Sequence, residues 1–359
     1  MGMKMVQDVK PGGVFMINCQ WTDEELDEHL NAADKKYIAD NNIQLYTINA
    51  IDKAIEIGMG KRTNTILQSA FFKLADVMPI DEAVEFMKAA AKKSYGKKGD
   101  AVVQMNWKAI DAGVDAVHKV NVPESWHNPA PDAAPKALKG PDALVKQIRD
   151  VMEPISRMDG DSLPVSAFEG NVNGEWEQGA SAYEKRGTAV MVPEWDAEKC
   201  IQCNQCAYVC PHAVIRPVVM NEEEKNNAPA GMKVTPMTGM PGYYFTMTVS
   251  VLDCTGCGSC TNVCPGNNRN DVLKMASLET QMDEQKFLEY GLTVSDKPEV
   301  LEKFKKGTVK GSQFVQPLLE FSGACAGCGE TPYAKLITQI CGDRMLIANA
   351  TGCSSIWAG

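Results

Sequence analysis

Thirteen cysteines and only four histidines distinguish this 359-residue chain. Only Cys19 lies within the first 199 residues, and the other twelve fall into three groups. These are Cys200, Cys203, Cys206 and Cys210, then Cys254, Cys257, Cys260 and Cys264, and last Cys325, Cys328, Cys341 and Cys353. Thiols two residues apart are too crowded for a disulfide framework, which is typical of short secreted chains. The grouping therefore indicates metal binding.

The first two groups share one spacing. C-x2-C-x2-C-x3-C-P begins at Cys200 and again at Cys254, and it is typical of bacterial ferredoxins with two [4Fe–4S] clusters. Three thiolates two residues apart can bind three irons of one cubane, whereas the fourth starts a helical turn and points to the other cubane. We therefore predict crossed ligand sets, with Cys200, Cys203, Cys206 and Cys264 at cluster 1 and Cys254, Cys257, Cys260 and Cys210 at cluster 2.

Two structural zinc sites are the alternative for these groups. Zinc is usually bound by separate C-x2-C pairs, so zinc leaves the repeated spacing and the two following prolines unexplained. The 43 residues between Cys210 and Cys254 are an elaboration that includes a predicted strand from Tyr243 to Val251. His212 is also near the first run. Thiolates fill all eight ligand positions, so we expect His212 to lie on the surface.

The third group carries a weaker signal. Cys325 and Cys328 form a lone C-x2-C pair in GACAGCGETPY, and Cys353 lies in ATGCSS. Such a pair could be a redox pair, half of a metal site or a coincidence. We expect a helix from Pro332 to Cys341, with Cys341 as a buried core thiol, and a strand from Met345 to Ala350. Both cysteine turns would then lie at the carboxyl edge of an α/β sheet, where cofactors usually bind.

The chain resembles the pyruvate:ferredoxin (flavodoxin) oxidoreductases. The resemblance rests on CAGCGETPY, on GDRMLIANATGCSSI, on the double cysteine run, and upstream on TNTILQSAFFKLADVMP and YGKKGDAVVQMN. It implies oxidation of pyruvate with coenzyme A to acetyl-CoA and carbon dioxide. Thiamine pyrophosphate with magnesium would be the carbanion sink, and iron–sulfur clusters would pass single electrons to ferredoxin or flavodoxin. It also implies a much longer, homodimeric full-length enzyme, of which this chain is an internal piece.

The resemblance also assigns residues near the C-terminal end. It places Cys325, Cys328 and Cys353 at a third [4Fe–4S] cluster whose fourth cysteine comes from a later part of the family's chain. It places Glu330, Thr351, Gly352 and Ser354 near thiamine pyrophosphate. The family's Gly-Asp-Gly motif for diphosphate and magnesium has no match, since Arg344 follows Asp343. No catalytic residue is assigned, and we expect this piece alone to be inactive toward pyruvate.

The elements expected around these motifs form a multidomain α/β and α+β chain. A partial parallel layer has strands at Gly12–Asn18 and Ile43–Ala50, and a helix with a capping box from Thr22 to Asp40 between them. Further helices are expected at Asn64–Val77, Asp81–Tyr95, Asp100–Val120 and Ala143–Met152. We predict four parts: 1–125, part of a γ-type α/β domain; 126–185, a linker and small connecting domain; 186–298, a ferredoxin-like domain with two [4Fe–4S] clusters; and 299–359, the start of a thiamine-diphosphate-binding α/β domain.

Composition restricts the partners. The 46 acidic residues outnumber the 36 basic ones, which argues against a nucleic-acid backbone. The longest apolar runs are well short of the roughly 20 residues of a membrane helix, and no secretory signal is visible. We therefore expect a cytoplasmic protein with no nucleic-acid or membrane partner. A non-catalytic ferredoxin-like electron-transfer subunit, or an oxidoreductase for another 2-oxoacid, remains open as an alternative.

Overall fold

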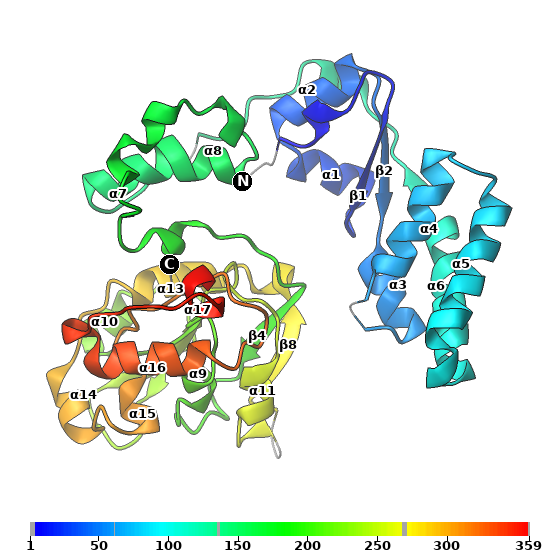
Figure 1. Cartoon of the computed structure of the whole chain (residues 1–359). Helices are drawn as coiled ribbons and strands as arrows, with labels where there is room; N and C mark the ends of the chain where they lie inside the picture. Colours follow the sequence, from blue (N-terminus) through cyan, green and yellow to red (C-terminus); the bar gives the residue numbers. More distant parts are fainter. Residues whose placement is uncertain (1–3, 61, 135–136, 268–270, 358–359) are drawn as a thin grey trace. The chain divides into compact units, whose positions relative to one another are not determined.

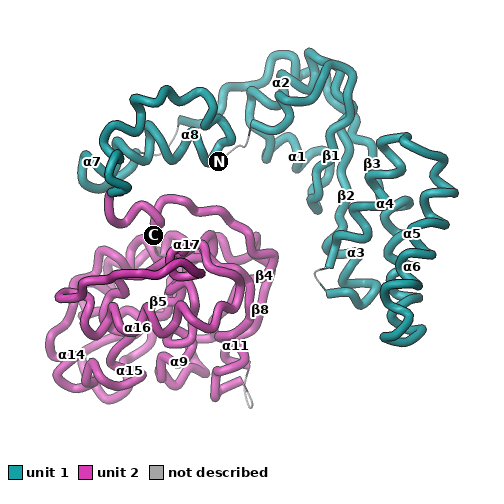
Figure 2. The backbone as a smooth tube through the Cα atoms, in the orientation of Figure 1, with its two compact units in different colours: residues 1–175 teal, residues 176–359 magenta. Residues whose placement is uncertain are grey.

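The structure, a computed structural model, describes residues 4–60, 62–134, 137–267 and 271–357 (Figure 1). The chain forms two compact units, unit 1 (Met1–Glu175) and unit 2 (Trp176–Gly359), which Figure 2 distinguishes by colour. Both contain helices and strands, so the mixed α/β class expected from the sequence is confirmed. The predicted division into four parts is finer than these two units, and its boundaries at residues 125, 185 and 298 stay predictions.

Unit 1 contains a small, mostly parallel sheet (Figure 1). β1 (Val14–Asn18) and β2 (Gln44–Ile48) pair in parallel, with Val14 opposite Gln44. A short strand, β3 (His118–Lys119), pairs antiparallel with β2. Both strands predicted from apolar runs are confirmed. The helix predicted to continue to Val120 ends at Asp115 instead, because the chain then enters β3.

The helix predicted between β1 and β2 is two helices, α1 (Asp23–His29) and α2 (Ala32–Asp40). The capping box at its start is confirmed, since the Glu25 backbone N donates to Thr22 Oγ1 at 3.2 Å and the Thr22 backbone N donates to Glu25 Oε2 at 2.9 Å. The break falls at Asn31, whose extended backbone and side chain cap the first turn of α2. Asn31 is thus the N-cap of a new helix, although the apolar spacing continues across it, and this divides the predicted helix in two.

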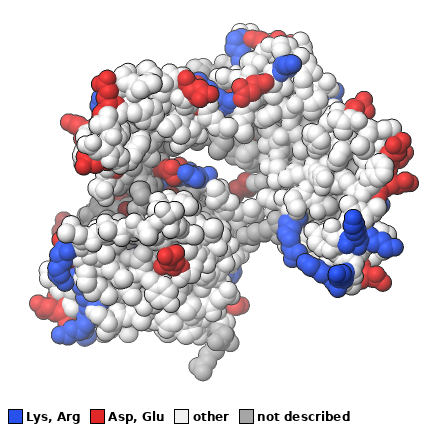
Figure 3. Space-filling view, in the orientation of Figure 1, with Lys and Arg blue, Asp and Glu red and all other residues white. Residues whose placement is uncertain are grey.

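Three long helices of unit 1, α4, α5 and α6, pack on one another. The helices after β2 are α3 (Ala50–Ile57), α4 (Asn64–Ala75), α5 (Ile80–Tyr95), α6 (Asp100–Asp115), α7 (Asp142–Gln147) and α8 (Glu153–Ser156), with a π-helical segment η4 (Ile148–Met152) between the last two. Short 3₁₀ helices are η1 (Val6–Asp8), η2 (Gly96–Lys98), η3 (Glu124–His127), η5 (Gly160–Ser162) and η6 (Val165–Asn171). Exposed lysines gather where α5 leads into η2 (Figure 3), namely Lys92, Lys93, Lys97 and Lys98.

Unit 2 holds two small antiparallel sheets. β4 (Met191–Trp195) pairs with β8 (Leu273–Ser277), and β7 (Tyr244–Val249) lies between β5 (Ile215–Met220) and β6 (Thr235–Pro236). The strand predicted from Tyr243 to Val251 is therefore confirmed as β7. The core between the sheets includes Trp195, Met247 and Phe245, and Phe245 is completely buried.

Short helices connect and cover these sheets (Figure 1). They are η7 (Ala180–Tyr183), α9 (Gln205–Tyr208), α10 (Glu222–Asn226), α11 (Ser259–Val263), η8 (Leu278–Gln281), α13 (Glu284–Gly291), α14 (Pro298–Lys303), α15 (Val309–Ser312), α16 (Thr331–Cys341), η9 (Gly342–Arg344) and α17 (Cys353–Trp357). Helix α16 confirms the helix predicted to end at Cys341.

Three expectations for the last part of the chain are wrong. Residues 345–350, which the structure describes, form no strand, and Leu346 is completely exposed. An apolar run becomes a strand only beside another strand, and none lies next to this one within the described part of unit 2. The cysteine turns of the third group consequently do not lie at a sheet edge. Cys341 is only half-buried rather than a core thiol.

Glu284 at the start of α13 gives unit 2 a testable pH dependence. Burial raises the pKa of this carboxyl from 4.5 to about 7. Because the folded pKa lies above the unfolded one, the carboxyl weakens the fold increasingly as pH rises from 4.5 through 7. The full shift corresponds to about 3 kcal/mol, and solvent access to this half-buried side chain reduces it to about 1 kcal/mol.

We therefore expect Glu284→Gln to stabilise the chain by about 1 kcal/mol at pH 8 and to have little effect near pH 5. Urea unfolding at both pH values measures the difference. Glu289→Gln on the exposed side of the same helix is the matched control and should change neither value. An equal gain at both pH values would show that the Glu284 charge is not the cause.

Candidate metal centres

Four cysteines from both runs surround one cavity in unit 2. Cys200, Cys203 and Cys206 come from the loop that leads into α9, and Cys264 comes from the end of α11. The cavity and its opening to solvent together hold about 350 Å³ of space free of protein atoms. Its remaining walls are mostly apolar and include Trp195, Met247 and Val272. The side chains gathered here are the set that the spacing predicts for cluster 1.

A second cavity has the reciprocal composition. Cys254, Cys257 and Cys260 approach it from the loop before and within α11, and Cys210 approaches from the end of the first run. The cavity and its opening to solvent together hold about 330 Å³ of space free of protein atoms, with Pro193, Ile215 and Met275 among the walls. The structure thus groups Cys210 with the second run and Cys264 with the first. Whether the thiols bind clusters in these sets stays a prediction.

The donor set of both cavities fits a cubane. All thirteen cysteines are free thiols, so eight sulfur ligands are available. A zinc ion would hold its thiolates about 2.3 Å from a single point, whereas these thiols line the walls of a cavity. Four thiols around a larger apolar cavity suit a four-iron cluster, whose irons each need one protein sulfur.

Both cysteine loops bend through left-handed backbone at equivalent positions. Gln202 (φ 56°) and Asn204 (φ 62°) in the first loop correspond to Gly256 (φ 64°) and Gly258 (φ 76°) in the second. This turn directs backbone N–H groups at sulfur: Gln202 N donates to Cys200 Sγ at 3.3 Å, and Gly256 N donates to Cys254 Sγ at 3.4 Å. Such donors stabilise negative charge on a bound cluster.

Side-chain hydrogen bonds hold the two non-glycine residues in this unusual backbone. The Gln202 side chain donates to Pro236 O at 2.9 Å and accepts from Thr238 N at 2.8 Å. Asn204 Nδ2 donates to Lys310 O at 3.0 Å. Sequence reasoning missed these anchors. Asn is the residue that tolerates positive φ best after Gly, which is the one signal that marked Asn204.

Burial changes the acidity of the thiols in both cavities. It raises the pKa of Cys200 and Cys206, and it raises the pKa of Cys260 to about 12, with the neighbouring cysteines adding to each shift. These three thiols are therefore protonated in the metal-free chain at neutral pH. Binding of a metal cluster must release their protons, which makes assembly depend on pH.

His212 is buried, with 2% of its surface exposed, so the expected surface position is wrong. Its Nδ1 lies 3.0 Å from Ser322 O, and because a carbonyl oxygen only accepts, Nδ1 donates. Burial lowers the pKa of the ring, which favours this neutral tautomer. The His212 backbone O also accepts from Phe321 N at 2.9 Å. His212 therefore lines the second cavity and fixes the segment that leads to Cys325.

The third cysteine group is more open. Cys325 and Cys353 are exposed and Cys328 is half-buried. The backbone N–H groups of Thr331 and Glu330, at the start of α16, lower the pKa of Cys328, and Glu330 N lies 3.4 Å from its Sγ. A Cβ built on Gly327 would lie 3.5 Å from the Cβ of Cys257, so the C-x2-C turn borders the second cysteine loop. Cys353 begins α17.

The residues expected near thiamine pyrophosphate lie on the surface of unit 2. Glu330, Thr351 and Gly352 are exposed and Ser354 is half-buried. Gly352 N donates to Ser355 Oγ at 3.1 Å, within the same turn. The cavities described in this section do not include them, so their assignment stays a prediction.

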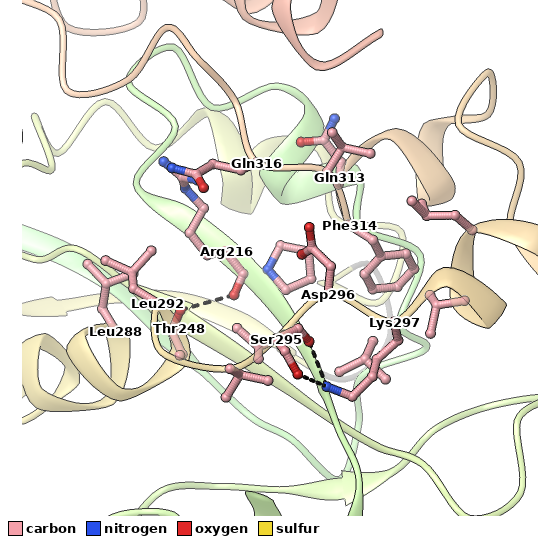
Figure 4. Close-up of a pocket in the computed structure, with 18 residues that line it drawn as sticks. Arg216, Thr248, Leu288, Leu292, Ser295, Asp296, Lys297, Gln313, Phe314 and Gln316 are labelled. Carbon is pink, nitrogen blue, oxygen red and sulfur yellow. Dashed lines mark hydrogen bonds between the residues drawn. The ribbon is translucent and has the colours of Figure 1, made fainter. Parts of the chain in front are cut away.

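One larger pocket lies away from the cysteines, between β5, β7 and α13 (Figure 4). Its two basic side chains already have partners within the chain. Lys297 Nζ lies 2.8 Å from Glu224 Oε1 and also donates to Ser295, while Arg216 pairs with Glu320. With these groups satisfied, no ligand is assigned to this pocket.

Known proteins match the chain along its length. It is 51% identical over 353 residues to a pyruvate-flavodoxin oxidoreductase of Enterobacter agglomerans, an alignment that covers 98% of this chain and 29% of the relative. It is 46% identical over 359 residues to a pyruvate:ferredoxin oxidoreductase of Moorella thermoacetica, covering 99% and 30%. Residues 2–116 match the family model described as pyruvate ferredoxin/flavodoxin oxidoreductase. Nearly the whole chain is therefore similar to part of these oxidoreductases.

The chain spans about three tenths of the length of these two curated relatives. Residues 131–189 match a domain of unknown function. Residues 199–268 match a 4Fe-4S dicluster domain, which contains all eight cysteines of the two runs. The cofactors of this region are therefore [4Fe–4S] clusters. A pyruvate dehydrogenase (NADP+) of Cryptosporidium parvum is also similar, at 42% identity over 380 residues, covering 98% of this chain and 19% of the relative.

Among the residues that the structure describes, no helix has the length and apolar character needed to cross a membrane.

Proposed function

We propose that this chain forms the electron-transfer section of an enzyme that oxidises pyruvate. Pyruvate and coenzyme A would yield acetyl-CoA and carbon dioxide, and the electrons would pass to ferredoxin or flavodoxin. The observation that carries the proposal is the pair of four-cysteine cavities in a chain similar to part of these oxidoreductases. A cytoplasmic, homodimeric full-length protein is part of the same proposal.

The ligand sets that we propose are crossed. Cys200, Cys203, Cys206 and Cys264 bind cluster 1, and Cys254, Cys257, Cys260 and Cys210 bind cluster 2, as their shared cavities favour. A bound [4Fe–4S] cluster accepts and releases one electron at a time. The chain's own groups set the conditions for this: apolar walls such as Trp195 exclude water, and N–H groups such as Gln202 N stabilise negative charge on sulfur.

We further propose that Cys325, Cys328 and Cys353 contribute to a third [4Fe–4S] cluster with a cysteine from another part of the enzyme. The backbone N–H groups that lower the pKa of Cys328 support this, because they favour the thiolate, which is the form that binds iron. Glu330, Thr351, Gly352 and Ser354 would then lie near thiamine pyrophosphate and its magnesium. The thiamine cofactor supplies the electron sink for decarboxylation.

Anaerobic reconstitution of the chain with iron and sulfide tests the proposal. We expect about eight irons and about eight acid-labile sulfides at the two crossed sites, and a paramagnetic resonance signal after reduction. A variant with Cys325, Cys328 and Cys353 changed to serine is the matched control, because it removes the third group and should keep all of this iron. Two zinc ions and no acid-labile sulfide in that variant would contradict the proposal.

A further inference from the structure

Lys335 is a buried cation that the electron-transfer proposal leaves unused. It lies on α16 with 1% of its surface exposed. Its Nζ donates to Ala207 O, to Tyr208 O at 3.0 Å and to Gln313 Oε1 at 3.4 Å. An ammonium group has three protons, and each finds an acceptor here. The arrangement therefore suits the charged form of the side chain.

The two carbonyl groups that hold Lys335 lie between the two cysteine cavities. Ala207 and Tyr208 belong to the short stretch that runs from Cys206, at the first cavity, to Cys210, at the second. Burial lowers the pKa of Lys335 to about 8, and its electrostatic interaction with Cys210 and Cys206 acts in the opposite direction. The ammonium is thus close enough to interact electrostatically with one cysteine of each set.

The charge of Lys335 is not neutralised by a nearby acid. In the part of the chain that the structure describes, the ionisable groups that influence it are Cys210, Cys206 and Arg216, and none is a carboxylate. Arg216 itself pairs with Glu320. In a medium of low polarity, an unpaired cation acts on neighbouring charges over several ångströms with little screening.

Buried amides hold the Lys335 side chain in place. Gln313 Nε2 donates to Gln339 Oε1 at 3.1 Å, and Gln339 Nε2 donates to Val315 O at 2.8 Å. Gln313 and Gln339 are both buried. Gln339 lies one helical turn after Lys335 on α16, so the two side chains share a face of the helix. A satisfied network of this kind gives the ammonium one position relative to the cavities.

We propose that Lys335 sets the reduction potentials of the two clusters by stabilising their reduced forms. This inference rests on the proposed crossed cluster sites. Reduction adds one negative charge to a cluster, and a fixed cation nearby makes that charge more favourable, which raises the potential. Lys335 acts through space and binds no iron, so it is a positioning residue for charge rather than a ligand.

Potentials of the reconstituted full chain, measured by redox titration with paramagnetic resonance, test this role. We expect Lys335→Met to lower the reduction potentials of both clusters by about 59 mV. This shift corresponds to a roughly tenfold smaller equilibrium constant for one-electron reduction. Lys335→Arg keeps the charge and should restore most of the difference. Lys274→Met is the matched control: it removes the same charge from an exposed lysine of β8 and should leave both potentials unchanged.

The variants also separate charge from packing. Lys335→Met leaves two buried carbonyls without a donor and could prevent folding for that reason alone. Lys335→Gln also removes the charge but keeps N–H donors. If the methionine variant does not fold, the glutamine variant tests whether the charge affects the potentials. Unchanged potentials at full iron content in the folded neutral variant would overturn the role of Lys335. Equal shifts in the glutamine and arginine variants would overturn it too, because geometry and not charge would then set the potential. Failure of the unaltered chain to bind iron would instead reject the cluster sites themselves.

Discussion

Cys210→Ala is expected to remove the cluster held by Cys254, Cys257 and Cys260, and to spare the cluster of the run in which Cys210 itself lies. The reason is the position of its side chain, which lines the second cavity with those three cysteines. A cubane with three of its four protein thiolates is exposed to solvent at one iron and readily lost. We expect the iron content of the two sites to fall from about eight to about four per chain.

Cys264→Ala is the reciprocal variant, because Cys264 lines the cavity of Cys200, Cys203 and Cys206. It should lose the other cluster. Iron and sulfide analysis gives the number of clusters, and paramagnetic resonance of the two variants distinguishes which one is left. Cys19→Ala, a buried thiol of unit 1, is the control and should keep all of the iron. If each variant instead loses the cluster of its own run, the crossed assignment is wrong.

Which cysteines line each cavity could be predicted from sequence because spacing alone limits where each thiol points. Three thiols on one tight loop face one point, and a fourth three residues later, after a helical turn, faces away. The same local reasoning predicted β1, β2 and β7, whose apolar runs lie next to partner strands. It also predicted the capping box of Thr22 and Glu25, which needs no information beyond one turn of helix.

Features that depend on distant partners could not be predicted in this way. His212 looked like a surface residue because its partner, Ser322, lies 110 residues further along the chain. Lys335 carried no signal at all, since its partners Ala207 and Tyr208 are well over 100 residues away. The strand predicted at Met345–Ala350 is wrong for the opposite reason. It has the local pattern of a strand, and the described part of unit 2 offers it no strand to pair with.

Gly113→Ala is expected to destabilise unit 1 strongly while leaving the clusters intact. Helices α4 and α6 touch at this point, and a Cβ on Gly113 would lie 2.1 Å from both Ile66 O and Ser69 Oγ. Ile66 O is backbone, so the clash is relieved only by moving the helices apart. Overpacking of this kind costs about 3 kcal/mol, which corresponds to about 6–12 °C in the melting temperature of a unit of this size.

Gly96→Ala is the matched control for this substitution. Gly96 also lies in unit 1, its φ is −55°, and a Cβ there would meet no atom within 4 Å. Its effect should stay within about 1 kcal/mol. Thermal unfolding followed by circular dichroism measures the stability of both variants, and iron analysis follows the clusters. All eight predicted cluster ligands lie in unit 2, so Gly113→Ala should keep its iron at temperatures where unit 1 has unfolded. Loss of iron in step with the unfolding of unit 1 would show that the cluster sites depend on that unit for their stability.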